Sequence, residues 1–150
     1  MIRQEDSDFI VGTYVMYKEQ GMDQILQAMG YNHPSRMVIM SGTKYMKVEK
    51  KGDYWQITEC VKNFNFKECF CLKFRSGKKF SWTARNGSKV KSLVTRMGNK
   101  FEFRHEPSDL EEYKILYGET EFFEDGDVVM KMKVEGLDEF EAVYRYKKYK

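Results

Sequence analysis

Several features that mark common protein classes are missing from this chain of 150 residues. It has two prolines and no stretch rich in serine and glycine, so no linker is visible and we expect residues 1–150 to form one domain. No apolar run approaches the roughly 20 residues that a membrane-spanning helix needs. Positive charge is in small excess, with 26 Lys and Arg against 23 Asp and Glu, a net charge of +3. This balance is typical of a solvated surface and not of a dedicated nucleic-acid-binding protein.

Cysteine and histidine are scarce, and their spacing predicts no metal site. Cys60, Cys69 and Cys71 are odd in number, so a complete set of disulfides is impossible. The two histidines, His33 and His105, supply no recognisable ligand spacing. We therefore expect structural or inert thiols, no bound metal and a reducing compartment, the cytoplasm. The first residues, MIRQEDSD, are too polar for a signal peptide, although a secreted protein that has lost its leader stays open.

Motifs of catalysis are also missing from the sequence. The chain has no Gly-rich phosphate loop, no GxSxG and no HExxH. His33 stands beside a proline in a predicted loop, and His105 ends a predicted strand. We expect both side chains at the surface rather than as catalytic bases. The sequence thus predicts a protein that is not an enzyme and needs no cofactor.

The chain does contain a succession of short segments in which apolar and polar residues alternate, a pattern typical of β-strands. The predicted strands are Phe9–Lys18, Lys44–Lys50, Tyr54–Val61, Lys67–Arg75, Lys79–Ala84, Val90–Met97, Lys100–Arg104, Glu112–Phe123, Val128–Val134 and Phe140–Lys147. Glycine turns separate many of them, including Asn86-Gly87 and Asp125-Gly126, and such pairs favour tight hairpins. Consecutive strands are therefore predicted to pair antiparallel.

Helical spacing occurs only after the first predicted strand. In Gly21–Gly30 the apolar residues recur at i, i+3, i+4 and i+7, which are Met22, Ile25, Leu26 and Met29. After His33-Pro34, Ser35 is expected to cap a second short helix that runs to Met40. These two helices are too small to cover a sheet face, so we expect them to form a helix-turn-helix lid.

A row of consecutive hairpins exposes two sheet edges, and closure into an up-and-down barrel removes them. The predicted fold is therefore all-β: a ten-stranded antiparallel up-and-down barrel with the helical lid after its first strand. A barrel of this size encloses more volume than its inward side chains fill, which leaves a ligand cavity. Flexible methionine side chains suit such a cavity, and the lid holds four of the ten in the chain.

The residues also resemble those of a known family, the intracellular lipid-binding proteins, which comprise the fatty-acid-binding and cellular retinoid-binding proteins. The family's N-terminal signature is similar to Gly12–Met16 and Gly21–Met29, although Met22 stands where an aromatic residue is usual. Further similar stretches follow in order: Ser35-Arg36, Gly52-Asp53, Lys91–Thr95, Gly126–Met132 and Tyr146–Lys148. Long turns, and the segment His105–Asp109 in particular, are similar to those of nematode members.

The resemblance implies a calycin-like barrel that encloses one lipid, with the ligand passing at the helical lid. It implies a non-enzymatic carrier of a long-chain hydrophobic ligand, in the first place a fatty acid. Such a carrier is expected to act as a monomer that makes transient contact with membranes and binds no nucleic acid.

The family's head-group site departs from its usual pattern in this chain. Fatty-acid binders offer an inward Arg-x-Tyr on the last strand, but here Tyr144 occupies the arginine position beside Tyr146. Alternation turns Arg145 outward unless the strand shifts by one residue. A carboxylate without a charged partner in an apolar cavity costs several kcal/mol. Retinol or another neutral lipid is therefore the alternative ligand.

The resemblance and the strand pattern together select the candidate ligand-binding residues. Tyr144 and Tyr146 are expected at the head group, with Arg145 if the strand shifts. Phe66 or Phe64 is expected to gate the portal. The lid would contribute Met22, Ile25, Leu26 and Met37, and the inner wall Ile115 and Trp82.

Two other functions compete with carriage. The lysine and arginine clusters could meet anionic lipid heads, as in a membrane-interacting structural protein of the same fold. The C-terminal residues 144–150 interleave aromatic and basic side chains, a pattern also used to stack single-stranded nucleic acid. The mixed charge of the rest of the chain disfavours this second alternative.

Overall fold

The computed structural model describes residues 8–63, 67–84, 87–108 and 114–149 of the chain. The elements are β1 (Gly12–Gln20), α1 (Met22–Ala28), α2 (His33–Met40), β2 (Thr43–Lys51), β3 (Tyr54–Lys62), β4 (Lys67–Phe74), β5 (Phe80–Thr83), β6 (Lys89–Met97), β7 (Lys100–Pro107), β8 (Leu116–Phe122), β9 (Asp127–Val134) and β10 (Ala142–Lys148). The prediction of an all-β fold with ten strands and two short helices after the first strand is confirmed. Neither helix is long and apolar enough to cross a membrane, within the residues described.

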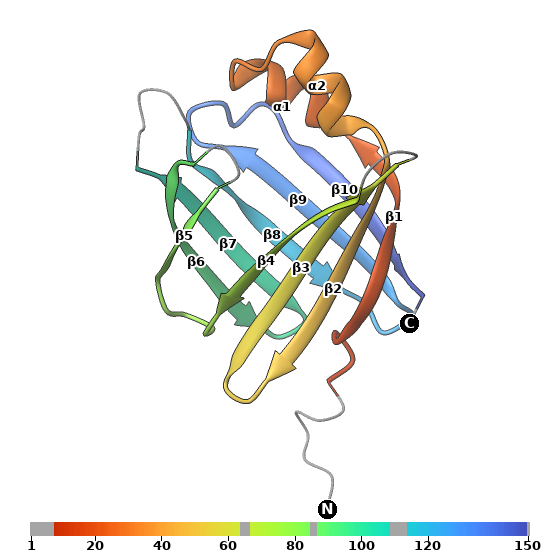
Figure 1. The fold of residues 1–150 in the computed structure, drawn as a ribbon. Helices are drawn as coiled ribbons and strands as arrows, with labels where there is room; N and C mark the ends of the chain where they lie inside the picture. The colour runs from red at the N-terminus through yellow and green to blue at the C-terminus, as the bar shows by residue number, and fades with distance from the viewer. Residues whose placement is uncertain (1–7, 64–66, 85–86, 109–113, 150) are drawn as a thin grey trace, which may run out of the picture.

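The strands form one antiparallel sheet in the order β4-β3-β2-β1-β10-β9-β8-β7-β6-β5. Each strand pairs with the next along the chain except at β4 and β5, and β1 pairs with β10. The sheet curls into a barrel that brings β4 and β5 near each other without pairing them (Figure 1). Two aromatic stacks span this opening: Phe70 on Trp82 and Phe74 on Phe80, with ring centroids 6.1 Å and 5.7 Å apart.

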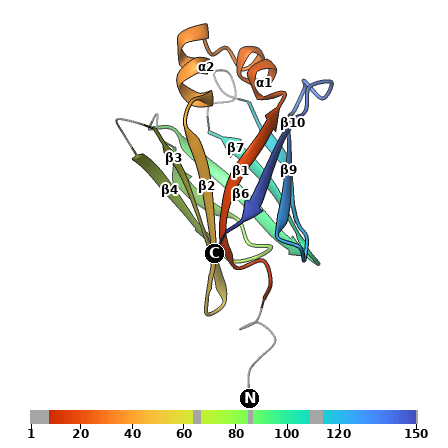
Figure 2. The ribbon, with the colours of Figure 1, turned by 90° about the vertical axis from the view of Figure 1, so that its right-hand side faces the viewer.

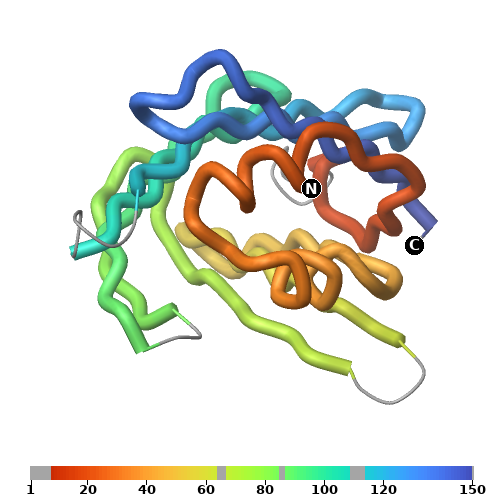
Figure 3. The backbone as a smooth tube through the Cα atoms, turned by 90° about the horizontal axis from the view of Figure 1, so that it is seen from above, coloured from red at the N-terminus to blue at the C-terminus, as the bar shows by residue number. Residues whose placement is uncertain are grey.

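The two helices lie across one end of the barrel, as the side view shows (Figure 2), and cover part of its interior when seen from above (Figure 3). Helix α1 is held down by its buried face, which consists of Met22, Ile25 and Leu26. Helix α2 starts at His33 and not at Ser35 as predicted, because the Asn32 side chain accepts a hydrogen bond from the Ser35 backbone N–H at 2.9 Å. Asn32 is therefore the cap, and Pro34 fits the first turn, where its missing N–H costs nothing.

The opposite end of the barrel is filled by packed aromatic rings. Phe101 contacts Trp55, Phe74 and Phe122, with ring centroids 5.2 to 5.9 Å apart. Tyr14 packs edge-on against Phe122 at 5.6 Å and donates its hydroxyl hydrogen to the Ile10 carbonyl at 2.7 Å. This aromatic plug closes the barrel at the end away from the lid. Any internal space therefore lies between the plug and the helices.

The structure corrects the cysteine prediction. Cys60 of β3 and Cys69 of β4 face each other in the hairpin register and form a disulfide, while Cys71 is an exposed free thiol. The spacing of the cysteines does not show this pair, because the register that brings Cys60 opposite Cys69 depends on where the hairpin turns. With a disulfide present, the cysteines no longer indicate a reducing compartment.

Candidate functional site

A cavity of about 260 Å³ lies inside the barrel. Its wall is built from every strand except β1 and β10. The lining residues are Met46, Ile57, Glu59, Phe70, Leu72, Phe74, Trp82, Val90, Val94, Phe101, Phe103, His105, Pro107, Lys114, Leu116, Thr120, Phe122, Met130 and Met132. Strand alternation explains this set, since residues two apart share a face, and the inward positions here are predominantly apolar. Such a wall is suited to an aliphatic ligand.

Glu59 is the one acidic residue among the described residues of this lining. It lies on the inner face of β3 in line with Trp55 and Ile57, and its neighbours across the strands are Met46 and Phe70. The surface it retains opens into the cavity rather than into bulk water. Burial among these apolar groups raises the pKa of the Glu59 carboxyl above its usual range, because the charged form loses its hydration.

A second polar feature in the wall is a chain of three side chains from β5, β6 and β7. The Trp82 indole N–H donates to the Ser92 Oγ at 2.7 Å. Ser92 Oγ and His105 Nδ1 are joined by a hydrogen bond of 2.6 Å. Desolvation lowers the pKa of His105 from 6.5 to about 4, so the imidazole is neutral at physiological pH. The expectation that His105 lies at the surface is wrong.

The tyrosines predicted at the head group both point into the barrel. Tyr144 and Tyr146 of β10 are buried, with 8% and 3% of their surfaces exposed. Burial is the main cause that raises the pKa of both hydroxyls, so both remain neutral. Neither tyrosine is among the residues that line the cavity. Arg145, which lies between them, takes the opposite face of β10, in agreement with the alternation.

Lys44 is a cation on the inner face of β2 that the sequence argument missed. Its ammonium group lies 5.8 Å from the centre of the Tyr144 ring. Partial burial lowers the pKa of Lys44, while the nearby Glu19 carboxylate raises it. Lys44 is not among the residues that line the cavity.

The remaining predicted site residues divide into three groups. Trp82 lines the cavity, whereas Ile115 is buried beside it and its neighbour Leu116 lines the wall instead. Met22, Ile25 and Leu26 pack beneath the lid as part of the core. Phe64 and Phe66 lie outside the described residues.

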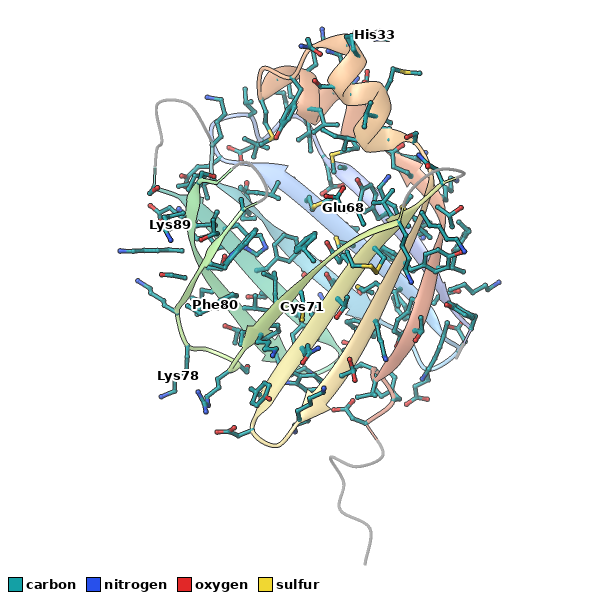
Figure 4. The ribbon with its side chains drawn as sticks, viewed as in Figure 1. His33, Glu68, Cys71, Lys78, Phe80 and Lys89 are labelled. Carbon is teal, nitrogen blue, oxygen red and sulfur yellow. A yellow bond between two sulfur atoms is a disulfide. The ribbon has the colours of Figure 1, made fainter. Side chains whose placement is uncertain are left out.

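Met37 does not line the lid as predicted, because it is 60% exposed. Helix α2 presents Ile39 and Met40 to the core and leaves Met37 and Val38 in solvent. The other exposed residues drawn in Figure 4 include His33 at the top of the lid and Lys78, which points away from the barrel.

Alternation could have placed two polar residues inside the barrel: Glu59, which the sequence analysis did not name, and His105, which it predicted at the surface. Trp55, Ile57 and Glu59 share one face of β3, and Phe101, Phe103 and His105 share one face of β7. A titratable group in step with apolar residues on a half-buried strand is the signal in both cases.

No known family model matches the chain, and no curated protein does. Solved structures do match it in fold. Caenorhabditis elegans lipid binding protein 8 has a TM-score of 0.78 and 15% identity, covering 99% of both chains. A Schistosoma mansoni fatty acid binding protein, solved with arachidonic acid, has a TM-score of 0.78 and 17% identity, over 95% of this chain and 98% of its own.

A third solved structure, a fatty-acid-binding protein from Drosophila melanogaster brain tissue, has a TM-score of 0.76 and 22% identity, over 93% of this chain and 99% of its own. These likenesses extend over nearly the whole of each chain. The chain therefore has the barrel fold of the intracellular lipid-binding proteins, as the resemblance in sequence implied.

Proposed function

We propose that this protein is a non-enzymatic carrier that binds one long-chain hydrophobic ligand inside the barrel. The observation that carries the proposal is the cavity itself: a largely apolar chamber between the lid and the aromatic plug. Each methylene group moved from water into such a chamber contributes about 0.8 kcal/mol, so affinity should grow with the length of the ligand's chain. The neighbours of like fold named as fatty-acid-binding proteins make a fatty acid the first ligand to test. Retinol or another neutral lipid is the second.

The test uses two tryptophan substitutions at adjacent positions of edge strand β4. Leu72 is half-buried and lines the cavity, whereas the adjacent Lys73 is exposed on the outer face. Leu72→Trp should fill part of the cavity. A ligand that enters beside the larger side chain then pays an overpacking cost of about 1–3 kcal/mol, so the affinity for a fluorescent long-chain probe should fall at least about tenfold. Lys73→Trp should bind as the unmodified protein does.

Mass spectrometry of the organic extract from natively purified protein identifies the ligand class in the same study. The proposal is supported if the extract of the unmodified protein contains one lipid per chain and the extract of Leu72→Trp lacks it. Equal probe affinity in the two variants, both folded by circular dichroism, contradicts it.

We also propose that the lid makes transient, apolar contact with membranes. Met37 and Val38 are exposed side by side on α2, at 60% and 59% of their surfaces. The basic residue beside them, Arg36, is engaged by Asp23 at 2.9 Å and by the Tyr31 carbonyl at 2.8 Å. Contact should therefore depend on burial of apolar surface rather than on attraction to anionic lipid.

The double substitution Met37→Ser with Val38→Ser tests this contact. It should slow ligand transfer to neutral vesicles without changing equilibrium affinity, and the rate in the unmodified protein should vary little with salt. A rate that depends steeply on salt and on anionic lipid would instead favour the alternative of a membrane-interacting structural protein.

A further inference from the structure

Glu59 is a half-buried acid on the cavity wall whose side chain has no partner among the described residues. Among the described residues, no hydrogen bond or ion pair involves its carboxyl oxygens, although they are enclosed by the cavity wall. Its oxygens keep accessible surface toward the cavity, since Asp127 Oδ1 is the one fully buried polar side-chain atom without a partner among the described residues. A ligand in the cavity can therefore supply the hydrogen-bond partner that the Glu59 carboxyl lacks.

The surroundings of Glu59 disfavour a negative charge at this position. Of the residues that line the cavity, Lys114 is the one cation, and it is exposed to solvent. Lys44 and Glu68 lie on the inner faces of β2 and β4, two residues nearer the lid than Met46 and Phe70, which are the neighbours of Glu59. Tyr144 and Tyr146 of β10 lie close enough to interact electrostatically with Glu59, and His105 of β7 lines the same cavity.

Apart from the solvent-exposed Lys114, none of these groups supplies an uncompensated positive charge to the cavity wall. Lys44 lies over Tyr144 and feels the charge of Glu19. His105 is kept neutral, and the two tyrosines remain protonated. A protonated carboxyl at Glu59 can donate one hydrogen bond into the cavity. An ionised one would hold an isolated charge in apolar surroundings.

Resting on the proposed carrier function, we propose that the ligand is a lipid with an uncharged oxygen, such as a long-chain alcohol, that accepts a hydrogen bond from the Glu59 carboxyl. A fatty-acid anion placed at the same point would put two carboxylates together without a cation between them. When two carboxylates share one site, their repulsion raises the pKa of one of them, so that it takes up a proton. The wall therefore selects against carboxylates and for hydroxyl-bearing lipids.

The polar chain Trp82–Ser92–His105 continues the same wall. Phe70 pairs with Glu59 across β3 and β4 and stacks on Trp82 across the barrel opening. In His105, Nδ1 is engaged by Ser92, and Nε2 has no partner among the residues described. The second polar position on this wall is thus also uncharged, which fits a neutral ligand and offers no counter-ion to an acid.

Calorimetric titration with tetradecan-1-ol and tetradecanoic acid tests the inference, because the two ligands differ only at the polar end. At pH 8 the alcohol should bind the unmodified protein at least about tenfold more tightly than the acid. The difference in affinity between the alcohol and the acid should decrease as the pH falls, because the carboxyl group of the acid takes up a proton and loses its charge.

Two substitutions at Glu59 separate its roles. Glu59→Leu removes the donor and should weaken binding of the alcohol about fivefold, the worth of one hydrogen bond. Glu59→Gln keeps a neutral donor, so it should retain the affinity for the alcohol, also at a higher pH where Glu59 itself would ionise and stop donating. Glu102→Gln, on the exposed outer face of β7, is the matched control and should behave as the unmodified protein.

The failure of this inference differs from the failure of the carrier function. If the acid binds at pH 8 as tightly as the alcohol, and Glu59→Leu alters neither affinity, the inference is wrong while the carrier function stands. If the folded protein binds neither ligand nor any lipid recovered by extraction, the carrier function itself is wrong, and the inference falls with it.

Discussion

Replacing His105 by asparagine should abolish a specific loss of stability in mild acid. The imidazole is neutral in the folded protein because burial lowers its pKa from 6.5 to about 4. Between these two values the unfolded chain takes up a proton that the folded protein refuses, so stability falls as the pH decreases through this window. The full difference of 2.5 pKa units corresponds to about 3 kcal/mol, of which about 2 kcal/mol is already lost at pH 5.

The assay is equilibrium unfolding in urea at pH 7.5 and pH 5. Asparagine can retain the hydrogen bond to Ser92 but does not titrate, so its loss of stability between the two pH values should be smaller by about 2 kcal/mol. The contributions of all other titrating groups cancel, because the unmodified protein and His105→Asn are compared between the same two pH values. His33→Asn, at an exposed position on the lid, is the control. If His105→Asn behaves as this control does, the imidazole is not buried in the way the structure shows, and the reasoning is refuted.

Four further results are expected. Gly21→Ala should destabilise the protein by about 1–3 kcal/mol in urea, because φ is 82° there and an added Cβ would meet the Glu141 carbonyl; a neutral result would contradict the close approach of α1 to β10. Leu26→Asn should loosen the lid and speed ligand dissociation in stopped-flow experiments, and an unchanged rate would place the ligand's exit elsewhere. Tyr146→Phe should change lipid affinity by less than about tenfold, the worth of one hydrogen bond, because Tyr146 is not among the residues that line the cavity, whereas a complete loss of binding would make its hydroxyl the main contact. Reduction of the β3–β4 disulfide should lower stability by about 2–3 kcal/mol, as expected for a short closed loop, and a larger loss would mean that it orders the barrel edge.

The fold could be predicted from the sequence because its information is local. Each strand carries its own alternation, and each hairpin its own glycine turn, so chain order alone gives the neighbours in an up-and-down barrel. The start of α2 was misplaced because two capping residues, Asn32 and Ser35, stand near each other and the choice depends on the backbone at Asn32.

The interior was harder to predict than the fold. Alternation assigned the faces of Tyr144, Arg145 and Tyr146 correctly, since it requires only the phase of one strand. The disulfide and the Trp82–Ser92–His105 chain both depend on the register between strands, which the sequence does not contain. His105 was predicted at the surface, and Glu59 was not singled out, because polar residues are most often exposed; their position in the alternation, which places both on the inner face, is the better guide.

The central claim, that a lipid lies inside the barrel, can be tested most directly by nuclear magnetic resonance of ¹³C-methyl-labelled methionine. Met46, Met130 and Met132 line the cavity, whereas Met97 is 53% exposed at the β6–β7 turn and serves as the internal control. During titration with a long-chain lipid, the three cavity methyl signals should shift together and saturate at one ligand per chain, while the Met97 signal stays in place. Cavity signals that do not move, or a Met97 signal that moves as they do, would contradict binding inside the barrel.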